Sequence, residues 1–373
     1  MAVKTGKTKR VVKKRTAKKS VKRKPVAKKR RPTALSRPEK NPIISPRPDH
    51  DWEAWQTFNP GVILLDDRVH FLYRALGSDG VSRLGYAVSD DGFNISKRLS
   101  YPVYEHQENK KQAEHIFRIF SYFSGGSWGG AEDPRLVQVE GEDIIYLTYT
   151  ACDNGLRVGL SAIKVADFLN KKWHWKEPVL ISSPQEVNKN WVIFPEKING
   201  RYAILHSLKP TVQIEYLDNL NFDNDDYIKS SDYTHLGCYG TKPRKNGWDK
   251  WVRGAGAPPL KTRAGWLLFY HAMDNDWGKY KVGALLLDLK DPTKILARAK
   301  EPILEPDKDY ENNGFKSGIV FVSGAVIKDE KLLVYYGCSD SYVGVAYANL
   351  EEFLTALEKD TEPKLKLKRL GKK

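Results

Sequence analysis

The sequence predicts an all-β fold, a five-bladed β-propeller, and two repeated observations support that prediction. Five segments repeat one pattern, in which an apolar strand, a tight polar turn and a second strand ending near Tyr or His follow one another. Most copies are followed by a further strand in which Gly or a small residue stands among apolar residues. The five segments are residues 61–75, 133–151, 194–207, 256–272 and 322–340.

Each copy is expected to form a β-hairpin, because its centre has the composition of a turn. The starts of the copies are 72, 61, 62 and 66 residues apart, which is longer than the roughly 40 to 50 residues of a compact propeller blade. The extra residues are expected to form long loops, and loops at the mouth of a propeller channel commonly bind ligands. The predicted turns are residues 66–68, 140–142, 199–201, 263–265 and 328–330.

The positive charge of the chain is concentrated at one end. Residues 1–40 contain 18 Lys and Arg and one acid, a net charge of +17, whereas the whole chain carries +16, so residues 41–373 carry about −1. Residues 1–40 have almost no large apolar side chain and are predicted to be a disordered tail, with the propeller in residues 41–373. Such a tail can bind nucleic acid or another polyanion. The alternative is that it only improves solubility.

Several classes of protein are disfavoured by what the sequence lacks. No apolar core of a secretory signal follows the basic start, so the cytoplasm is the expected location. No stretch approaches the roughly 18 apolar residues of a membrane span. The three cysteines lack the spacing of a zinc site or a disulfide framework, and neither a nucleotide-binding loop nor a metal-ligand motif is present. No cofactor and no metal are therefore expected.

Candidate chemistry lies where a glycine-rich loop, residues 124–130, leads into the second hairpin. Glu132, Asp133, Pro134 and Arg135 follow that loop. Proline biases the preceding residue toward extended conformations, so Asp133 is expected to be extended. Neighbouring side chains of an extended strand point to opposite faces, so Glu132 and Asp133 are not expected to act as one pair. On these residues alone, an ordinary turn in which Asp133 accepts backbone hydrogen bonds remains open.

A series of motifs occurs in one order along residues 59–354, at 59–61 with 73–75, 89–92, 130–135, 194–198 with 205–206, 254–259, 265–267 with 270–271, and 323–325 with 335–340. In this order they resemble glycoside hydrolase family 130, the β-mannoside phosphorylases and hydrolases, which are five-bladed propellers. The resemblance implies an inverting glycoside phosphorylase, a glycosyltransferase-type enzyme. It would cleave a β-mannosidic bond with inorganic phosphate and release α-mannose 1-phosphate.

The resemblance also assigns roles to residues. Asp133 matches the general acid, which protonates the glycosidic oxygen through the 3-hydroxyl of the mannosyl unit. An inverting hydrolase normally needs a second carboxylate to activate water, whereas phosphate is already an anion and needs cations to hold it. The predicted phosphate contacts are Lys197 and His271 first, then Arg74 and Arg157, and then Lys189 and His206. The predicted substrate contacts are Asn59 and Asp340, which would bind mannosyl hydroxyls, and Trp128, on which a sugar ring would stack.

Two other functions remain open at this stage. A hydrolase of the same fold would replace the phosphate cations and use another carboxylate as base, and a non-catalytic propeller would bind carbohydrate or a polyanion without needing Asp133. The linkage and the acceptor are not predicted, so β-1,4- and β-1,2-linked mannosides are all candidates. A homo-oligomer is possible, and inorganic phosphate is expected as a co-substrate.

Overall fold

The computed structural model describes residues 1–2, 33–107, 125–127, 129–152, 156–184, 186–208, 211–223, 226–230, 247–274 and 279–359. Residues Met1–Arg31 and Pro32–Lys373 separate as two units, and all the strands belong to the second unit. Most of the predicted tail, residues 3–32, lies outside the described residues. Its predicted disorder and polyanion binding therefore stay predictions.

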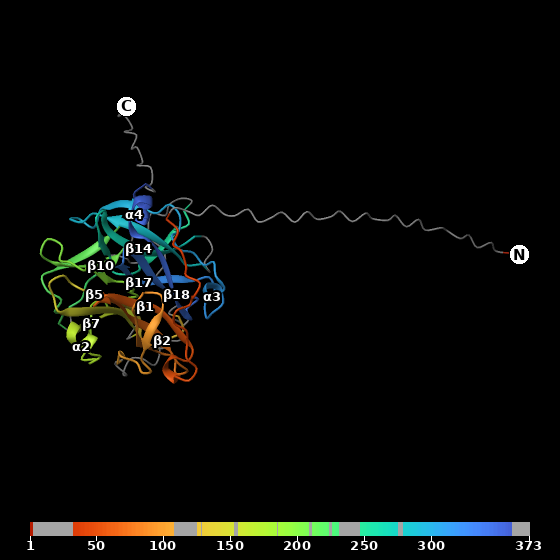
Figure 1. Cartoon of the computed structure of the whole chain (residues 1–373), viewed down its shortest axis with the longest axis horizontal. Coiled ribbons are helices and arrows are strands. Elements are labelled where there is room, and N and C mark those ends of the chain that lie inside the picture. Colours follow the sequence, from red (N-terminus) through yellow and green to blue (C-terminus); the bar gives the residue numbers. More distant parts are fainter. Residues whose placement is uncertain are drawn as a thin grey trace, which may run out of the picture. The chain divides into compact units, whose positions relative to one another are not determined.

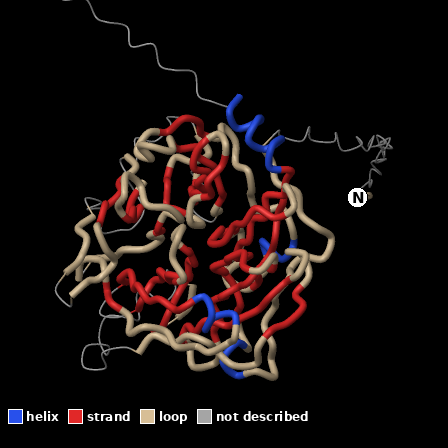
Figure 2. The backbone as a smooth tube through the Cα atoms, turned by 60° about the vertical axis from the view of Figure 1, so that its left-hand side comes forward, coloured by secondary structure: helices blue, strands red, loops and turns tan. Residues whose placement is uncertain are grey.

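The second unit consists mostly of antiparallel β-strands, as the sequence predicts. The largest sheet has two parts, which meet only where residues 81–82 run parallel to residues 129–130. When these parts are counted separately, the described strands pair into five antiparallel groups. Figure 2 shows these strands in red. The first two groups are β1 (Gln56–Leu65), β2 (Arg68–Leu76), β3 (Val81–Ser89) and β4 (Ile95–Arg98), then β5 (Gly129–Gln138), β6 (Ile144–Cys152), β7 (Leu156–Lys164) and β8 (Val179–Leu180). The others are β9 (Val192–Ile193), β10 (Tyr202–Ser207) and β11 (Gln213–Leu217), then β12 (Trp251–Ala255), β13 (Leu260–Thr262), β14 (Gly265–Met273), β15 (Lys281–Leu287) and β16 (Ile295–Arg298), then β17 (Val320–Lys328), β18 (Lys331–Cys338) and β19 (Tyr342–Asn349).

Each group contains one of the five predicted hairpins, with its turn at the predicted position. In the fourth hairpin the first strand is divided into β12 and β13, because Pro258 and Pro259 separate them and proline has no N–H to donate to a neighbouring strand. The strand predicted after each hairpin is also present, as β3, β7, β11, β15 and β19. The pairs that close the turns are Leu65 with Arg68, Gln138 with Ile145, Ile198 with Arg201, Thr262 with Gly265, and Lys328 with Lys331.

The glycine in the third strand of a group has a packing reason. In four groups it lies opposite a tyrosine of the second strand, whose ring lies across it. A Cβ atom added to Gly159 would lie 2.3 Å from Cζ of Tyr149, which is too close for any larger residue without movement of the ring. The pairs are Tyr73 with Gly85, Tyr149 with Gly159, Tyr270 with Gly283, and Tyr336 with Gly344.

Three of these tyrosines share another feature, a buried carboxylate that accepts from the tyrosine hydroxyl and is ion-paired with an arginine. In two of the sets the arginine is the last residue of the outermost strand of its group, β4 or β16. In the third set the arginine precedes the first strand of the chain. The sets are Tyr73, Glu53 and Arg98; Tyr270, Asp249 and Arg298; and Tyr336, Glu311 and Arg37.

Residues 33–44 belong to the packed unit and add to its last group of strands. Ser36 forms a β-bridge with Tyr347 of β19, and Leu35 is buried in the core. Arg37 Nε lies 2.6 Å from Glu311 Oε1. The predicted boundary after residue 40 is therefore too late, because the basic composition of this stretch hides one buried apolar residue and one arginine with a structural partner.

The position of Arg37 leads to a prediction about truncation. Deletion of residues 2–31 is expected to leave the melting temperature unchanged, since the second unit begins at Pro32. Deletion of residues 2–40 also removes Leu35 and leaves the fully buried Glu311 without Arg37. Loss of one partner of a buried ion pair costs about 3–5 kcal/mol, so the longer deletion is expected to melt at a clearly lower temperature. Equal melting curves for the two truncated proteins would contradict this account.

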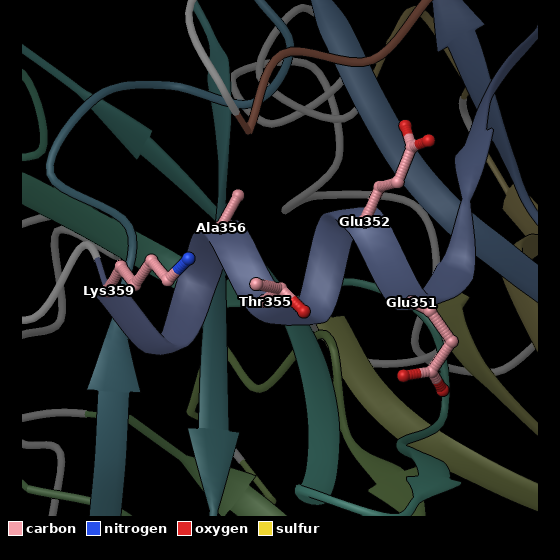
Figure 3. A pocket seen from close by; sticks show the side chains of 5 residues that line it. All are labelled: Glu351, Glu352, Thr355, Ala356 and Lys359. Carbon is pink, nitrogen blue, oxygen red and sulfur yellow. The ribbon is translucent and has the colours of Figure 1, made fainter.

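Short helices cover parts of the sheets: η1 (Asp51–Glu53), α2 (Val165–Leu169), α3 (Asp309–Asn312) and α4 (Leu350–Lys359). Helix α4 lies against strands of the last two groups (Figure 1). Its Phe353, Leu354 and Leu357 are buried in the core there. Its other side lines a surface pocket with Glu351, Glu352, Thr355, Ala356 and Lys359 (Figure 3). Within the described ranges, no helix is long and apolar enough to cross a membrane.

The register between paired strands is irregular in four of the groups. The first strand shifts register with its partner in four groups, at residues 58–61, 132–135, 252–254 and 322–324. A β-bulge of this kind re-aims the side chains next to it. In the hairpins of β1, β5 and β17 the shift lies toward the end opposite the turn, so polar side chains from different groups can meet there.

Candidate active site

Asp133 lies at the bulge of β5, toward the end of the hairpin that is opposite the turn. The register of β5 with β6 shifts between Glu132 and Arg135, and Asp133 has a φ of +49°. The expectation that Asp133 is extended is therefore wrong, because the bulge places it in the left-handed region even though Pro134 follows. Its side chain is almost completely buried, so the carboxylate depends on neighbouring groups for its hydrogen bonds.

Asn59 occupies the corresponding position in the first group and contacts Asp133. Both residues precede a proline, have positive φ and lie at a register shift. Asn59 Nδ2 donates to Asp133 Oδ1 at 2.7 Å. The repeat thus brings an amide and a carboxylate together from equivalent positions of β1 and β5, two strands that lie next to each other (Figure 1).

Arg74, on β2, joins two carboxylates that are neighbours in the sequence. Its Nη1 lies 3.1 Å from Asp133 Oδ1, and its Nη2 lies 3.0 Å from Glu132 Oε1. The expectation that Glu132 and Asp133 face opposite sides is therefore wrong, because the bulge interrupts the alternation of β5. Arg74 is held in place by a hydrogen bond from Nε to Ser82 Oγ, 2.9 Å, and by the ring of Phe58.

Glu132 is fully buried, and two cations balance its charge. Its Oε2 lies 3.1 Å from Lys189 Nζ, and its Oε1 accepts from Arg74. The same Oε1 also accepts from the hydroxyl of Ser127 and, at 3.1 Å, from the thiol of Cys152. Burial and the charge of Glu132 raise the pKa of Cys152 well above its usual value, so the sulfur keeps its proton and acts as a donor.

Asp133 is ionised at neutral pH. Burial acts to raise the pKa of Asp133, but the charges of Arg74, Lys189 and Arg135 and the hydrogen bond from Asn59 outweigh it and lower that pKa to about 2. The carboxylate is thus an anion stabilised by several cations. A ligand that brings a second negative charge to the same cations would raise the pKa of Asp133, because a nearby like charge disfavours the ionised form.

Arg135 holds the bulge from its other side. Its guanidinium donates to the main-chain oxygen of Asp133, to the main-chain oxygen of Gly256 at 3.1 Å and to Oδ1 of Asn190 at 2.9 Å. The group also lies over the ring of Phe321. Burial lowers the pKa of Arg135 to about 10, so it is still a cation at neutral pH.

His271, on β14, is buried as a neutral imidazole. Its Nε2 donates to the main-chain oxygen of Val322 at 2.7 Å, and its ring stacks on Phe321 with 3.9 Å between centroids. Burial, together with the charge of Arg135, lowers the pKa of His271 to about 3. Its predicted contact with phosphate stays a prediction.

The two predicted lysines lie at opposite ends of the second hairpin. Lys189 is beside Glu132, near Asp133. Lys197 Nζ instead lies 3.2 Å from Oε1 of Glu142, in the turn that joins β5 to β6, and over the ring of Tyr202. The structure therefore brings Lys189 to the acid and places Lys197 away from it.

Two further predicted phosphate contacts lie at the same end of the strands as Asp133. Arg157 is the second residue of β7 and donates through Nε to the main-chain oxygen of Ser182 at 3.0 Å. His206 lies near the end of β10, with Nδ1 3.2 Å from Oγ of Ser230, and burial lowers the pKa of His206 to about 4. Neither contact tests binding of phosphate.

Of the predicted sugar contacts not yet placed, Asp340 is described by the structure and Trp128 is not. Asp340 lies in the turn between β18 and β19 with a φ of +50°, and its Oδ2 is 3.2 Å from Lys316 Nζ. Trp128 lies outside the described residues. Across the described part of the chain, no group of three or more His, Cys, Asp or Glu side chains is arranged to hold a metal ion.

Three residues of the cluster around Asp133 had no assigned role in the prediction from sequence: Glu132, Arg135 and Asn190. The available signal was the run of two acids and an arginine around Pro134. In a regular strand these side chains would alternate between two faces. The bulge instead brings Glu132, Asp133 and Arg135 into one cluster. Asn190 lies far from the run in sequence and gave no signal of its own.

The chain matches the family model described as beta-1,4-mannooligosaccharide phosphorylase, glycoside hydrolase family 130, over residues 27–359. A 1,2-beta-oligomannan phosphorylase of Thermoanaerobacter sp. (strain X514) is 35% identical over 327 residues, which cover 85% of this chain and 98% of that protein. A beta-1,2-mannobiose phosphorylase from the same strain is 34% identical over 331 residues, covering 85% and 98%.

Solved structures agree with this match. The beta-1,2-mannobiose phosphorylase of Listeria innocua, in complex with beta-1,2-mannobiose, superposes with a TM-score of 0.65 at 27% identity, covering 87% of this chain and 99% of that one. A second structure has a TM-score of 0.67 at 26% identity, covering 85% and 94%, and its report concerns glycoside hydrolases within the same family that target beta-1,2 mannosidic linkages in Candida mannan. The family match spans most of the residues, and the chain belongs to glycoside hydrolase family 130.

Proposed function

We propose that this protein is an inverting phosphorylase, which cleaves a β-mannosidic bond with inorganic phosphate and releases α-mannose 1-phosphate. The observation that carries the proposal is the carboxylate of Asp133, held by Asn59 and Arg74 at the bulge of β5 in a chain of this family. β-1,2-linked mannosides are the first candidates, because the relatives at 35% and 34% identity are named for that linkage.

The finer architecture that we propose is a five-bladed propeller with one group of strands in each blade. Contacts between the first and last groups support it, since Ser323 Oγ on β17 donates to the main-chain oxygen of Pro60 on β1 at 3.1 Å. The bridges from Ser36 and Ile44 to β19 also bring the start of the packed unit to its last group. Both contacts are expected of a ring whose two ends are joined.

In the proposed mechanism Asp133 is the general acid, and it acts on the glycosidic oxygen through the 3-hydroxyl of the mannosyl unit. In the free protein its pKa of about 2 leaves it without a proton at neutral pH. Phosphate bound beside Lys189 would share its positive charge and raise the pKa of Asp133 toward the range useful for catalysis. Binding of the nucleophile would thus prepare the acid.

A phosphorylase needs only one catalytic carboxylate, and the state of Glu132 is consistent with that. Glu132 is fully buried and ion-paired with both Arg74 and Lys189. In an inverting hydrolase the base activates a water on the far side of the sugar. The two carboxyl groups are then typically about 6.5–9.5 Å apart, which leaves room for that water. Glu132 instead holds the cations that face Asp133.

The two lysines give a direct test of the phosphate contacts. Lys189→Met is expected to raise the KM for phosphate by at least about tenfold, because one charge-assisted contact of this kind is worth about 1.5–3 kcal/mol. Lys197→Met is the matched control, since Lys197 pairs with Glu142 at the other end of the hairpin. Initial rates at varied phosphate measure both. If Lys197→Met raises the KM for phosphate more than Lys189→Met does, Lys197 is the more important phosphate contact, as the sequence predicted.

The remaining proposals concern partners. We keep the basic tail, now bounded at residue 31, as a candidate polyanion or nucleic-acid contact, because residues 1–31 contain 16 Lys and Arg and no acid. A homo-oligomer and a cytoplasmic location stay proposals, and so does the use of inorganic phosphate as a co-substrate with no cofactor.

The experiment that tests the proposed function is incubation of the purified protein with a panel of β-mannosides, with and without inorganic phosphate. Mannose 1-phosphate is expected, only with phosphate, and most rapidly from a β-1,2-linked mannoside. Free mannose formed equally without phosphate would mean a hydrolase. No product from any substrate would favour the non-catalytic binding protein.

A further inference from the structure

Phe315 is an exposed aromatic residue on the segment between α3 and β17. Its side chain is 47% exposed, although large apolar side chains are mostly buried in this unit. A single exposed aromatic residue is ordinary on a protein surface and has no meaning by itself. Its neighbours, and the way its backbone is fixed, give this one a meaning.

The backbone of Phe315 is fixed against the turn between β18 and β19. Its N–H donates to Ser341 Oγ at 2.8 Å, and the N–H of Lys316 donates to the main-chain oxygen of Ser339 at 3.0 Å. A Cβ atom added to Gly314 would lie 2.5 Å from Cβ of Ser339, so the segment and the turn are in close contact. The exposed ring therefore stands on a rigid support, as a preformed binding surface requires.

The ring of Phe315 also reaches the glycine-rich loop that leads to Asp133. A Cβ atom added to Gly126 would lie 3.0 Å from Cζ of Phe315, and one added to Gly125 would lie 3.4 Å from Nη1 of Arg74. That Nη1 is the atom that contacts Asp133. Two glycines without side chains thus separate the ring of Phe315 from the guanidinium that holds the acid.

Polar groups stand beside the ring. Lys316 is the next residue, and its Nζ lies 3.2 Å from Oδ2 of Asp340. The charge of Asp340 contributes to the raised pKa of Arg74, so this ion pair and the acid belong to one electrostatic environment. The ring of Phe315 therefore lies between the Lys316–Asp340 ion pair, which offers donors and acceptors, and the cluster around Asp133.

This combination fits the chemistry of a pyranose. A sugar ring has an apolar face of C–H groups, which packs on an aromatic face, and a rim of hydroxyls, which need donors and acceptors. We propose that Phe315 is the stacking platform for a sugar ring of the β-mannoside, with Lys316 and Asp340 as hydrogen-bonding partners of its hydroxyls. The proposal rests on the proposed function and adds a substrate-binding residue to it.

The test compares variants that separate an aromatic face from mere apolar bulk. Phe315→Leu is expected to raise the KM for the best β-mannoside by about two- to tenfold, because leucine keeps apolar bulk but loses the flat aromatic face on which the sugar ring stacks. Phe315→Trp keeps an aromatic face and is expected to keep a KM close to that of the unmodified protein. The KM for phosphate is expected to stay the same in both variants, since phosphate has no apolar face.

The matched control is Ile295→Ala on β16, since Ile295 has the same exposed fraction, 47%, and is on an outer strand. It is expected to change neither KM. Thermal melting of each variant identifies any that fails to fold, and if Phe315→Leu does not fold, Phe315→Met is measured in its place with the same expected rise in KM. An unchanged KM in Phe315→Leu, or an equal rise of both KM values, would overturn the proposal. So would a change of oligomeric state without a change of KM.

Calorimetric binding of mannooligosaccharide to the unmodified protein and to Phe315→Leu separates this proposal from the proposed function. If the protein catalyses no reaction but binds the oligosaccharide through Phe315, the phosphorylase assignment fails and the platform stands. If it catalyses phosphorolysis and Phe315→Leu binds equally well, the platform fails and the phosphorylase stands. Absence of both binding and reaction rejects both.

Discussion

Replacement of Asp133 by asparagine is expected to reduce phosphorolysis by about 10²- to 10⁴-fold, the usual contribution of a general acid. The amide keeps an oxygen that can accept from Asn59 and from Arg74, as Asp133 Oδ1 does, so the fold is expected to remain intact. Initial rates of mannose 1-phosphate formation measure the loss, and circular dichroism checks the fold. Turnover at the unmodified rate would reject Asp133 as the acid.

The pH dependence of the same variant gives an independent check. The pKa of Asp133 in the folded protein, about 2, is lower than that of an exposed aspartate, about 3.9. Its ion pairs therefore stabilise the fold above about pH 4, and this contribution is lost as the pH falls toward 2. The difference in unfolding free energy between the unmodified protein and Asp133→Asn is expected to narrow over that interval. A difference that is independent of pH would mean that Asp133 is not held as an anion.

Arg74→Met is expected to have the largest effect on stability. Arg74 is almost completely buried between Glu132 and Asp133, and removal of one partner of a buried ion pair costs about 3–5 kcal/mol. Activity is expected to be lost as well, because the carboxylate of Asp133 loses its main cation. Urea unfolding and initial rates measure the two effects.

Arg68→Met is the matched control for Arg74→Met. Arg68 lies on the same strand and is also ion-paired, with Asp90, but both side chains are exposed. Exposed pairs contribute about 0–1 kcal/mol, so little change is expected. Adding Glu132→Gln to Arg74→Met should restore part of the stability, since it removes one of the two buried carboxylates that lose Arg74 as a partner. Equal unfolding midpoints for Arg68→Met and Arg74→Met would contradict the description of the cluster.

The hairpins were predictable from the sequence because their cause is local. Turn composition and apolar alternation are read within a few residues, and the turns at 66–68 and 328–330 lie where they were expected. The third strands were predictable for the same reason, although the tyrosine opposite each glycine was not. That pairing depends on register across two strands, and neither residue carries a signal of it.

The site was predictable only in part. Asp133 and its neighbours form a compact motif, whereas the conformation of Asp133 depends on a bulge that alternation does not contain. Lys197 and Lys189 are both near the second hairpin in sequence, and only the fold shows which end each occupies. Arg37 was assigned to the tail because basic composition looks the same whether or not one residue has a buried partner.

The bridges of Ser36 and Ile44 with β19 have a consequence for how the protein is made. During synthesis the residues that complete the last group of strands leave the ribosome first, about 300 residues before their partners at Val343 and Tyr347. Leu35 stays exposed until the strands around it have been made, and Arg37 has no buried carboxylate to bind until Glu311 has been made. The final docking step therefore waits for nearly the whole chain, and contacts of such long sequence separation form slowly.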